Sequence, residues 1–468
     1  MRDIALASPQ PSSMTRRQAT TIVVLAVAQL MLVLDVTVVN VALPDIGTEL
    51  NVGRTTLTWV MTIYTTLFGG LVLLGGKAAD VFGARRVLIA GVLLFTISSL
   101  ICAVAGNAVT LLAGRAAQGA GAALLSPAAL AVLLAHTNGA ARGKALAVWG
   151  ALSAVGTALG VSVGGILTSS LGWEWVFAIN VPIGALLLVV LPILTSPVRG
   201  TPARSDVPGA IFVTAGTALI VYALVNAGSS GWAAPGTIFA LAMGAVLWAT
   251  FALVEQRTAE PLLKISLLAE PSIAAGSLLM IVATGLMVGN FFLGSFALQR
   301  VYGDGALAVG LEFLPVAIAV GAGAQLGGRL LQSVSARWIA TLSLGLAALG
   351  EGTAALGQSR GTLIVGLTLA SFGIGAVFVT AFSASLAAAG AKDRGLRSAV
   401  VSTAHELGGA FGVALMSSIA GSALTAHHPT TDAFSRTFAV AAAIATLTAV
   451  CATAIVPAAR KESAPGQR

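Results

Sequence analysis

The chain has 468 residues, of which 57% are hydrophobic and 9% are charged, and its formal net charge is +8. Soluble globular proteins carry roughly 25% charged residues, so this composition excludes a chain built from two or three soluble domains. The basic residues lie in short loops between apolar runs and not in one patch, which excludes a nucleic-acid-binding surface.

Apolar runs follow one another along the whole chain. A run of about twenty residues crosses the ~30 Å hydrocarbon core of a bilayer as a helix rising about 1.5 Å per residue. Weak alternation and abundant Ala, Leu and Gly favour helices over the strands of a barrel. We therefore predict an all-α integral membrane protein with about fourteen spans, at residues 21–43, 56–76, 86–105, 108–134, 144–168, 175–195, 208–226, 236–255, 272–297, 306–328, 338–357, 361–388, 399–424 and 436–458.

The loops between these spans predict the side of the membrane that each one faces. The first run, 21–43, is too long for the core of a signal peptide, so we expect it to be retained. With both termini cytoplasmic, most Lys and Arg residues fall in cytoplasmic loops, and the outer loops receive only Arg54, Arg300, Arg360 and Arg436. This asymmetry predicts an even number of spans and a multi-pass protein of the cell membrane.

Two hydrophilic stretches divide the chain. The first, 196–208, follows the sixth predicted span, and the second, 255–270, follows the eighth. We therefore predict an N-terminal six-helix bundle over residues 1–196, two linker helices over 197–266 and a C-terminal six-helix bundle over 267–468.

The two bundles are related by an internal repeat. At one constant offset, residues of the first recur in the second: Gly76 and Arg85 match Gly328 and Arg337, Arg142 matches Arg394, and Gly156 and Gly160 match Gly408 and Gly412. One such pair would be a coincidence in a Gly-rich chain, but several at one offset indicate a parallel repeat. A parallel repeat places a shared cavity between the two halves, as in transporters that rock one half against the other.

Ionisable residues inside the spans are the candidate functional residues, because each costs roughly 2.5–3.5 kcal/mol at the centre of a membrane. Asp35 lies about two-thirds of the way along the first span, and Asn40, nearer its outer end, is a polar candidate for the cavity. A carboxyl at this depth can exchange a proton for a cationic substrate, which is the elementary step of antiport. The alternative is a structural carboxylate buried against a neighbouring helix.

Arg115 lies inside the fourth span and carries a fixed charge, because a guanidinium stays protonated at physiological pH. It cannot carry a proton itself, and we expect it to bias a nearby carboxylate or to link the inward and outward packings. A purely structural ion pair is the alternative.

The second half offers acidic candidates of its own. Glu312 and Glu406 lie within the tenth and thirteenth spans and could line the cavity, although Glu312 lies near the outer loop and could face water. Glu351, near the outer end of the eleventh span, is a weaker candidate. His405 points about 100° away from Glu406 on a helix, so the two need not cooperate.

Glycines and the remaining polar residues complete the candidates. Gly156, Gly160 and Gly164 recur every four residues, which predicts either a static packing seam or a hinge. We expect no metal, because His427, His428 and Asp432 in one outer loop do not form a four-ligand set. The near match to a phosphate-binding loop, 75–78, lacks its Ser or Thr. We therefore expect no cofactor and no ATP hydrolysis.

Four motifs occur in order along the chain. They are LDVTVVNVALP at Leu34–Pro44, GKAADVFGARRVL at Gly76–Leu88, Arg115 with Gln118, Gly119 and Gly121, and WEWVFAINVPIG at Trp173–Gly184. Together they resemble the motifs of the major facilitator superfamily, and specifically of its fourteen-span drug/proton antiporter branch. The resemblance covers residues 20–458.

This resemblance implies roles for individual residues. It implies that Asp35 takes part in cation recognition or proton coupling and that Arg115 takes part in coupling proton transfer. It further implies a cytoplasmic gate that contains Gly76, Asp80, Gly83 and Arg85, and a helix 5 antiporter motif at Gly156, Gly160, Gly164 and Gly165.

The chain departs from these motifs at several positions. Val161 replaces the proline of the helix 5 motif, which weakens an argument for antiport from that helix alone. In the gate motif, the usual leucine and two basic residues are replaced by Ala78, Val81 and Ala84, and the second-half copy has Gln332 at the Asp80 position.

The leading functional hypothesis is proton-driven efflux of amphipathic, cationic or aromatic compounds by a chain that the resemblance implies is a monomer in the lipid bilayer. Export of one endogenous metabolite or antibiotic is the alternative, and a nutrient-uptake symporter is less favoured. The chain shows neither the filter-like loop of a channel nor the paired nucleophile and base of a membrane enzyme.

Overall fold

The computed structural model describes residues 16–137, 156, 159–196, 206–258, 261–357, 359–386, 394–424 and 431–456. All regular structure in these ranges is helical. Thirteen of the helices are long and apolar enough to cross a membrane, and a shorter apolar helix, Leu159–Leu171, accompanies them. The prediction of an all-helical chain with about fourteen spans is therefore confirmed. Arg142, His427, His428 and the first part of the predicted span 144–168 lie outside the described residues.

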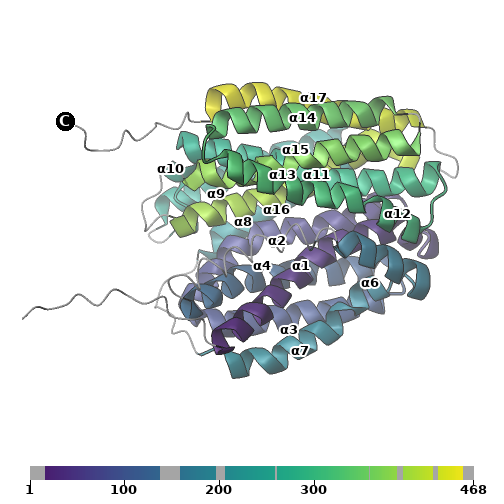
Figure 1. The fold of residues 1–468 in the computed structure, drawn as a ribbon. Coiled ribbons are helices and arrows are strands. Elements are labelled where there is room, and N and C mark those ends of the chain that lie inside the picture. The colour runs from purple at the N-terminus through teal and green to yellow at the C-terminus, as the bar shows by residue number, and fades with distance from the viewer. Residues whose placement is uncertain are drawn as a thin grey trace, which may run out of the picture.

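The helices up to residue 194 form what we call the N-terminal group. It consists of α1 (Arg16–Glu49), α2 (Arg54–Phe82), α3 (Ala84–Ala103), α4 (Ala108–His136), Leu159–Leu171, α6 (Trp175–Ala178) and α7 (Asn180–Leu194). Figure 1 shows this group, coloured purple to blue, below the rest of the molecule.

The helices from residue 265 onwards form the C-terminal group. It consists of α10 (Ile265–Leu268), α11 (Pro271–Phe296), η1 (Ala297–Val301), α12 (Ala306–Glu312), α13 (Leu314–Leu330), α14 (Ala336–Leu356), α15 (Arg360–Leu386), α16 (Arg394–Ala420), η2 (Gly421–Leu424) and α17 (Thr431–Ile455). Helix α1 begins and α17 ends at the same end of the bundle (Figure 1), which we call the terminal end; the opposite end is the distal end.

The same helix pairs pack in both groups. In the N-terminal group, α4 packs against α2 and α3, and α3 also packs against α7. In the C-terminal group, α15 packs against α13 and α14, and α14 also packs against α17. The internal repeat predicted from matched residues therefore extends to the packing of the helices.

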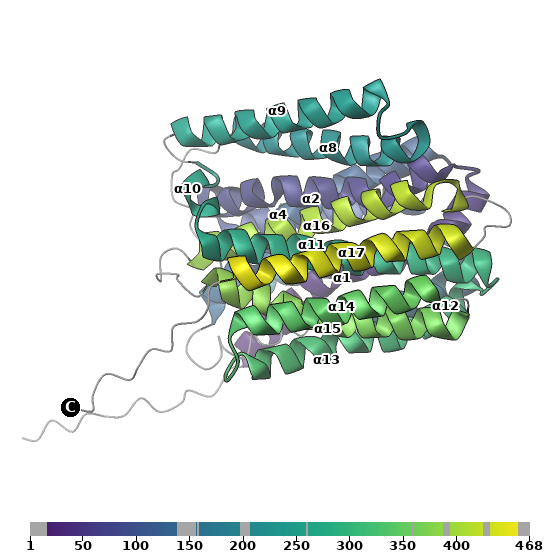
Figure 2. The same cartoon turned by 90° about the horizontal axis from the view of Figure 1, so that it is seen from above.

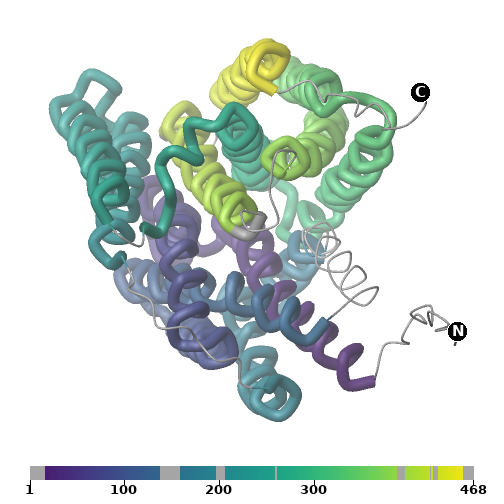
Figure 3. Tube along the Cα trace, turned by 90° about the vertical axis from the view of Figure 1, so that its left-hand side faces the viewer, coloured from purple at the N-terminus to yellow at the C-terminus, as the bar shows by residue number. Residues whose placement is uncertain are grey.

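Two helices separate the groups along the chain, α8 (Val207–Ser230) and α9 (Pro235–Arg257), which we call the insertion. They lie side by side at one side of the molecule, as Figures 2 and 3 show. Of the two, α8 packs against α2 of the N-terminal group and α16 of the C-terminal group. The predicted domain boundary at 266/267 falls inside the short helix α10, and the three-domain division stays a prediction.

Local sequence explains where the helices begin, end and break. Gly83 links α2 to α3 with a φ of 92°, a conformation that favours glycine. Asn107 caps α4 by accepting a hydrogen bond from the Thr110 backbone N–H at 3.0 Å. The predicted span 306–328 is two helices, because the chain breaks at Phe313 and Pro315 lies in the first turn of the next helix. Most helices also extend past the apolar runs, as α1 does from the predicted 21–43 to 16–49.

Hydrogen bonds join the two groups near the distal end. Gln299 donates to the Val41 carbonyl at 2.9 Å, and Arg300 donates to the Pro44 carbonyl at 3.1 Å. Close by, a Cβ at Gly165 would lie 2.6 Å from the Ala306 carbonyl oxygen, so the helix Leu159–Leu171 touches α12 there. The distal end of the junction between the groups is thus closed.

Candidate functional site

A buried ion pair joins the two residues that the sequence marked most strongly. Arg115 Nη1 donates to Asp35 Oδ2 at 2.5 Å, which links α4 to α1. Both side chains are 0% exposed. The carboxylate near Arg115 that we expected is therefore Asp35 itself.

Two neutral side chains donate hydrogen bonds to the carboxylate of this pair, and a third bonds one of them. Gln118 Nε2 donates to Asp35 Oδ1 at 3.1 Å, and Asn180 Nδ2 donates to the same oxygen at 3.0 Å. Gln118 also donates to Ser99 Oγ at 2.8 Å and accepts a hydrogen bond from Arg115 Nη1 at 2.9 Å. Helices α1, α3, α4 and α7 thus meet at one polar cluster, made of Asp35, Ser99, Arg115, Gln118 and Asn180, which we call the N-site.

The guanidinium of Arg115 is held from other directions as well. Its Nε donates to the Val60 carbonyl at 2.9 Å, and its Cζ lies 4.4 Å from the centre of the Tyr64 ring. The Phe177 ring lies 5.8 Å away on another side. Aromatic faces stabilise a cation, so α2 and α6 contribute to keeping Arg115 charged in an apolar interior.

The two charges of this buried pair depend on one another. A buried pair is stable only while both charges are present, because removing one charge leaves the other uncompensated. A proton on Asp35 would neutralise the carboxylate and leave Arg115 with its carbonyl and aromatic contacts. The electrostatics of the N-site therefore depend on the charge that Asp35 carries.

The other predicted residues of the first half lie away from this cluster. Asn40 is 1% exposed, donates to the Val36 carbonyl of its own helix at 3.0 Å and has an unpaired Oδ1. It stands five positions after Asp35 and directly before Val41, whose carbonyl accepts the hydrogen bond from Gln299 of η1. The side chain of Asn40 is thus placed near the junction of the two groups, and its role in the cavity stays a prediction.

The acidic candidates of the second half lie in two different environments. A Cβ at Gly69 of α2 would lie 2.9 Å from Glu406 Cβ, so Glu406 lies where the two groups meet. Glu406 Oε1 lies 3.2 Å from His405 Nδ1. The two side chains leave the helix in different directions but are long enough to meet. Glu312 instead pairs with Arg360 at 3.2 Å near the distal end, where Arg360 also pairs with Asp304 at 2.8 Å.

The predicted gate residues lie where α2 meets α3 at the terminal end. Asp80 is exposed and interacts electrostatically with Lys77. Arg85 donates to the Pro192 carbonyl of α7 at 2.6 Å, so it holds two helices of the N-terminal group together. Gly83 forms the turn, whereas a Cβ at Gly76 would lie 3.8 Å from Pro127 Cβ, an ordinary contact distance. The close crossing of α2 and α4 is at Gly75, where a Cβ would lie 2.0 Å from the Ala123 carbonyl oxygen.

The glycines of the predicted helix 5 motif face two partners. Gly156, Gly160 and Gly164 all face α1, and a Cβ at Gly160 would lie 1.8 Å from Thr37 Oγ1. Gly165 faces α12 of the C-terminal group. The first three form a packing seam against the helix that carries Asp35, and a hinge motion there stays a prediction.

Several polar residues had no predicted role. Gln118 and Asn180 stand within the motifs quoted above, which was a usable signal, and Ser99 was hidden in an apolar run. Arg54, expected in an outer loop, is buried at the start of α2 and donates to Val225 of α8 and Ser417 of α16, both at 3.2 Å. Glu351, a weak candidate, is 0% exposed and accepts a hydrogen bond from Asn290 at 2.7 Å. No group of three or more His, Cys, Asp or Glu residues that could hold a metal occurs in the described part of the chain.

Comparisons with known proteins agree with this architecture. A family model described as the Major Facilitator Superfamily matches residues 25–323. Puromycin resistance protein pur8 of Streptomyces alboniger is 37% identical, over 87% of this chain and 82% of its own length. Cephamycin export protein CmcT of Amycolatopsis lactamdurans is 33% identical, over 97% of this chain and 96% of its own length. Multidrug resistance protein Stp of Mycobacterium tuberculosis is 30% identical, over 88% and 78%.

Solved structures show the same fold. The peptide transporter POT in complex with sulfate superposes with a TM-score of 0.66 at 16% identity, covering 93% of this chain and 94% of that one. A bacterial homologue of the human lysosomal transporter Spinster, inward-facing and occupied, has a TM-score of 0.64 at 15% identity, covering 95% and 97%.

Proposed function

The chain belongs to the Major Facilitator Superfamily, as its motifs predicted, and on that premise we propose that it exports an amphipathic drug or antibiotic in exchange for protons. It is a multi-pass membrane transporter and not an enzyme. Its relatives are named for antibiotic resistance, antibiotic export and multidrug resistance. The observation that carries the coupling proposal is the buried pair of Asp35 and Arg115.

Asp35 is suited to bind the proton and not the substrate. A cationic substrate beside Asp35 would lie next to the fixed charge of Arg115, which would repel it. The carboxylate is also enclosed by Gln118 and Asn180, so a drug-sized molecule has no access to it in this arrangement. A proton is small enough to bind there, and the hydroxyl that it forms would take an acceptor, such as the unpaired Asn180 Oδ1, in place of a present donor. Of the two roles that the resemblance implied, the geometry supports proton coupling.

The substrate path in this proposal runs between the two groups. Glu406 and Asn40 lie near that junction, where a carboxylate and an amide can contact a cationic or polar part of the substrate. Hydrogen bonds close the junction at the distal end. Alternating access then requires these bonds to break as the groups rock and as Asp35 changes its proton occupancy.

We extend the proposal to the surroundings of the protein. The energy source is the proton gradient across the cell membrane, and the transporter acts as a monomer with both termini in the cytoplasm. Transporters of this family in general work without a bound cofactor. The residues around Gly76, Asp80, Gly83 and Arg85 form the cytoplasmic gate at the terminal end.

Reconstituted transport tests the coupling role of Asp35. Purified protein in proteoliposomes is given ethidium, a fluorescent amphipathic cation, and an imposed pH gradient. Asp35→Asn, which mimics the protonated acid, should reduce gradient-driven ethidium flux to the level of empty liposomes. Asp45→Asn, ten positions later on α1 and exposed, is the matched control and should retain flux. Wild-type flux that ignores the pH gradient, or full flux in Asp35→Asn, would reject the proposal.

A dedicated exporter is the second candidate, because some relatives are named for single antibiotics. A resistance screen in an efflux-deficient bacterial host separates the two. Protection against chemically unrelated compounds, such as ethidium, puromycin and lincomycin, supports multidrug efflux. Protection against one compound class alone supports the dedicated exporter.

A further inference from the structure

A second carboxyl group lies deep inside the C-terminal group. Glu351 is on the buried face of α14, in line with Ala347 and Ala354, and no part of it reaches the surface. Beside it, α14 and α15 approach closely, since a Cβ at Gly350 would lie 2.2 Å from the Ala370 backbone nitrogen. The group is therefore sealed from the surrounding membrane by helix packing.

The hydrogen bonding of Glu351 is incomplete in a specific way. Asn290 Nδ2 of α11 donates to Glu351 Oε1 at 2.7 Å. The two atoms left without partners are Glu351 Oε2 and Asn290 Oδ1, and both are acceptors when the acid is ionised. A proton on Oε2 turns this carboxyl oxygen into a donor for an amide oxygen. One proton can therefore satisfy both unpaired atoms of the same pair of side chains.

No basic group compensates a charge on Glu351 among the described residues of the helices packed around it. The charged residues of α11, η1, α14, α15 and α17 lie at helix ends: Arg300, Arg337, Arg360, Asp432 and Arg436. Each of these arginines has another partner. Arg300 donates to the Pro44 carbonyl, Arg337 donates to the Val456 carbonyl and Arg436 donates to the Asp432 carbonyl. Arg360 pairs with Asp304 and Glu312. The other titratable groups are Cys451, toward the terminal end of α17, and Tyr302. A buried carboxyl without a counter-charge is stable as the neutral acid.

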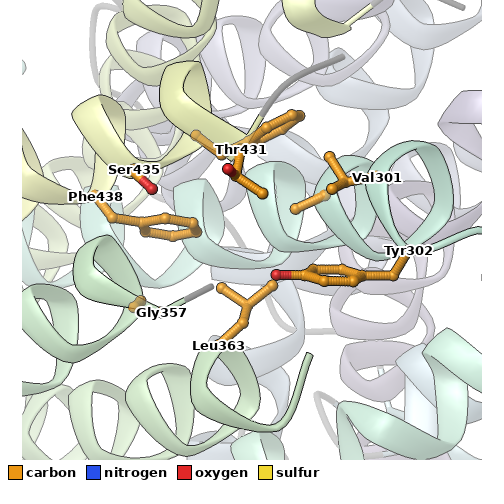
Figure 4. A pocket seen from close by; sticks show the side chains of 10 residues that line it. Val301, Tyr302, Gly357, Leu363, Thr431, Ser435 and Phe438 are labelled. Carbon is orange, nitrogen blue, oxygen red and sulfur yellow. The ribbon is translucent and has the colours of Figure 1, made fainter. Parts of the chain in front are cut away.

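A pocket at the distal end lies close to this acid. It is lined by residues of η1, α14, α15 and α17, including Tyr302, Leu363 and Phe438 (Figure 4). Ala354 also lines it, and Ala354 lies one helical turn beyond Glu351 on the same face of α14. A small rearrangement of this turn would connect the acid to the distal side.

The internal repeat relates Glu351 to the N-site. Glu351 stands where Ser99 stands in the first half, at the offset that also relates Gly408 to Gly156. Ser99 accepts the hydrogen bond from Gln118, whose amide also donates to Asp35. The second half thus places an acid at the position where the first half places a member of the Asp35 cluster.

We propose that Glu351 is a second proton-binding residue of the transporter, which holds a proton against Asn290 in this conformation and releases it when the C-terminal group rearranges. This inference rests on the proposed proton coupling and adds to it a second site in the other half. The chain would then carry one proton at Asp35 and one at Glu351 in each cycle.

Infrared spectroscopy of the purified full-length protein tests the proton directly. The C=O stretch of a protonated carboxyl is separate from the bands of carboxylates and amides. Wild-type protein near neutral pH should show such a band, and Glu351→Gln should lose it while keeping the hydrogen bond from Asn290. Asn290→Leu should shift the band, and Asp432→Asn, an exposed carboxyl of the same group, should leave it unchanged. A band that survives in Glu351→Gln, or none in the wild type, would overturn the proposal.

Proton counting in proteoliposomes tests whether the proton moves. Pyranine inside the vesicles reports protons while ethidium fluorescence reports substrate. Glu351→Gln should move one proton fewer per ethidium than the wild type, with gradient-driven transport retained. An unchanged ratio would make Glu351 a permanently protonated structural acid and reject its transport role alone. Wild-type flux that ignores the gradient would instead reject the proposed function, so the two failures are distinguishable.

Discussion

Among the described residues, the N-terminal and C-terminal groups each bury one carboxyl group completely, and they hold these carboxyls in different ways. In the N-terminal group, Asp35 accepts hydrogen bonds from a charged guanidinium and two amides. In the C-terminal group, Glu351 accepts one hydrogen bond, from the neutral amide of Asn290. Related helices thus enclose Asp35 with a cation beside it and Glu351 without one.

This difference shows how one architecture can hold a carboxyl in two protonation states. A fixed cation at contact distance favours the carboxylate, whereas an apolar surrounding with a neutral partner favours the acid. Under our proposals, the N-site in this conformation is ready to accept a proton and the Glu351 site already holds one.

The largest expected effect comes from making the N-site resemble the C-terminal one. Arg115→Met keeps the volume of the side chain and removes the cation, which leaves the Asp35 carboxylate buried without a counter-charge. We expect a loss of about 3–5 kcal/mol in the free energy of unfolding, measured by thermal or denaturant unfolding in detergent.

The double variant Asp35→Asn with Arg115→Met is the control for this prediction. Because it removes both charges, most of the lost stability should return, while gradient-driven transport stays absent. A single Arg115→Met variant as stable as the wild type would mean that Asp35 needs no counter-charge, and the contrast between the two sites would be lost.

A smaller effect is expected from breaking the neutral pair in the C-terminal group. Asn290→Leu removes the donor to Glu351 Oε1 and leaves a buried polar group unsatisfied, which should cost about 1–3 kcal/mol of unfolding free energy. Replacing both residues, Asn290→Leu with Glu351→Leu, should be closer to the wild type than Asn290→Leu alone. A loss as large as that of Arg115→Met would indicate that Glu351 is ionised.

The smallest effect is expected at Ser99, the position that the internal repeat relates to Glu351. Ser99→Ala removes an acceptor of Gln118, whose amide keeps its bond to Asp35, so about 0.5–1.5 kcal/mol should be lost. Ser98→Ala is the matched control, since the neighbouring Ser98 hydroxyl bonds only carbonyls of its own helix. Equal unfolding midpoints for the two variants would show that Ser99 does not support the N-site.

The fold was largely predictable from the sequence because hydrophobic length alone places the spans. The helices start and end within several residues of the apolar runs, and differ mainly where charged ends continue the helix, as at Arg16 and Glu49 of α1. The repeat was also visible, because glycines at tight crossings and arginines at loop ends recur at one offset. The break at Phe313 needed the position of Pro315 relative to the end of α12, which hydrophobicity does not give.

The candidate site was predictable as single residues and not as a cluster. Asp35 and Arg115 stand out because each is an ionisable residue in an apolar run, yet they lie eighty residues apart in the chain. Which helix faces touch depends on packing that no local pattern encodes. For the same reason Glu351, close to a helix end in the sequence, is sealed by α15, while Glu312 pairs with the exposed Arg360.

The buried cation of Arg54 makes the insertion difficult to remove. Its guanidinium is held by Val225 of the insertion and by Ser417 of the C-terminal group, and the nearby Thr58 hydroxyl also bonds Ser417 at 2.5 Å. Excision of α8 and α9 would remove an acceptor from a charge that has no solvent to replace it. Deleting α8 and α9 from this chain is therefore expected to need a substitution at residue 54 as well.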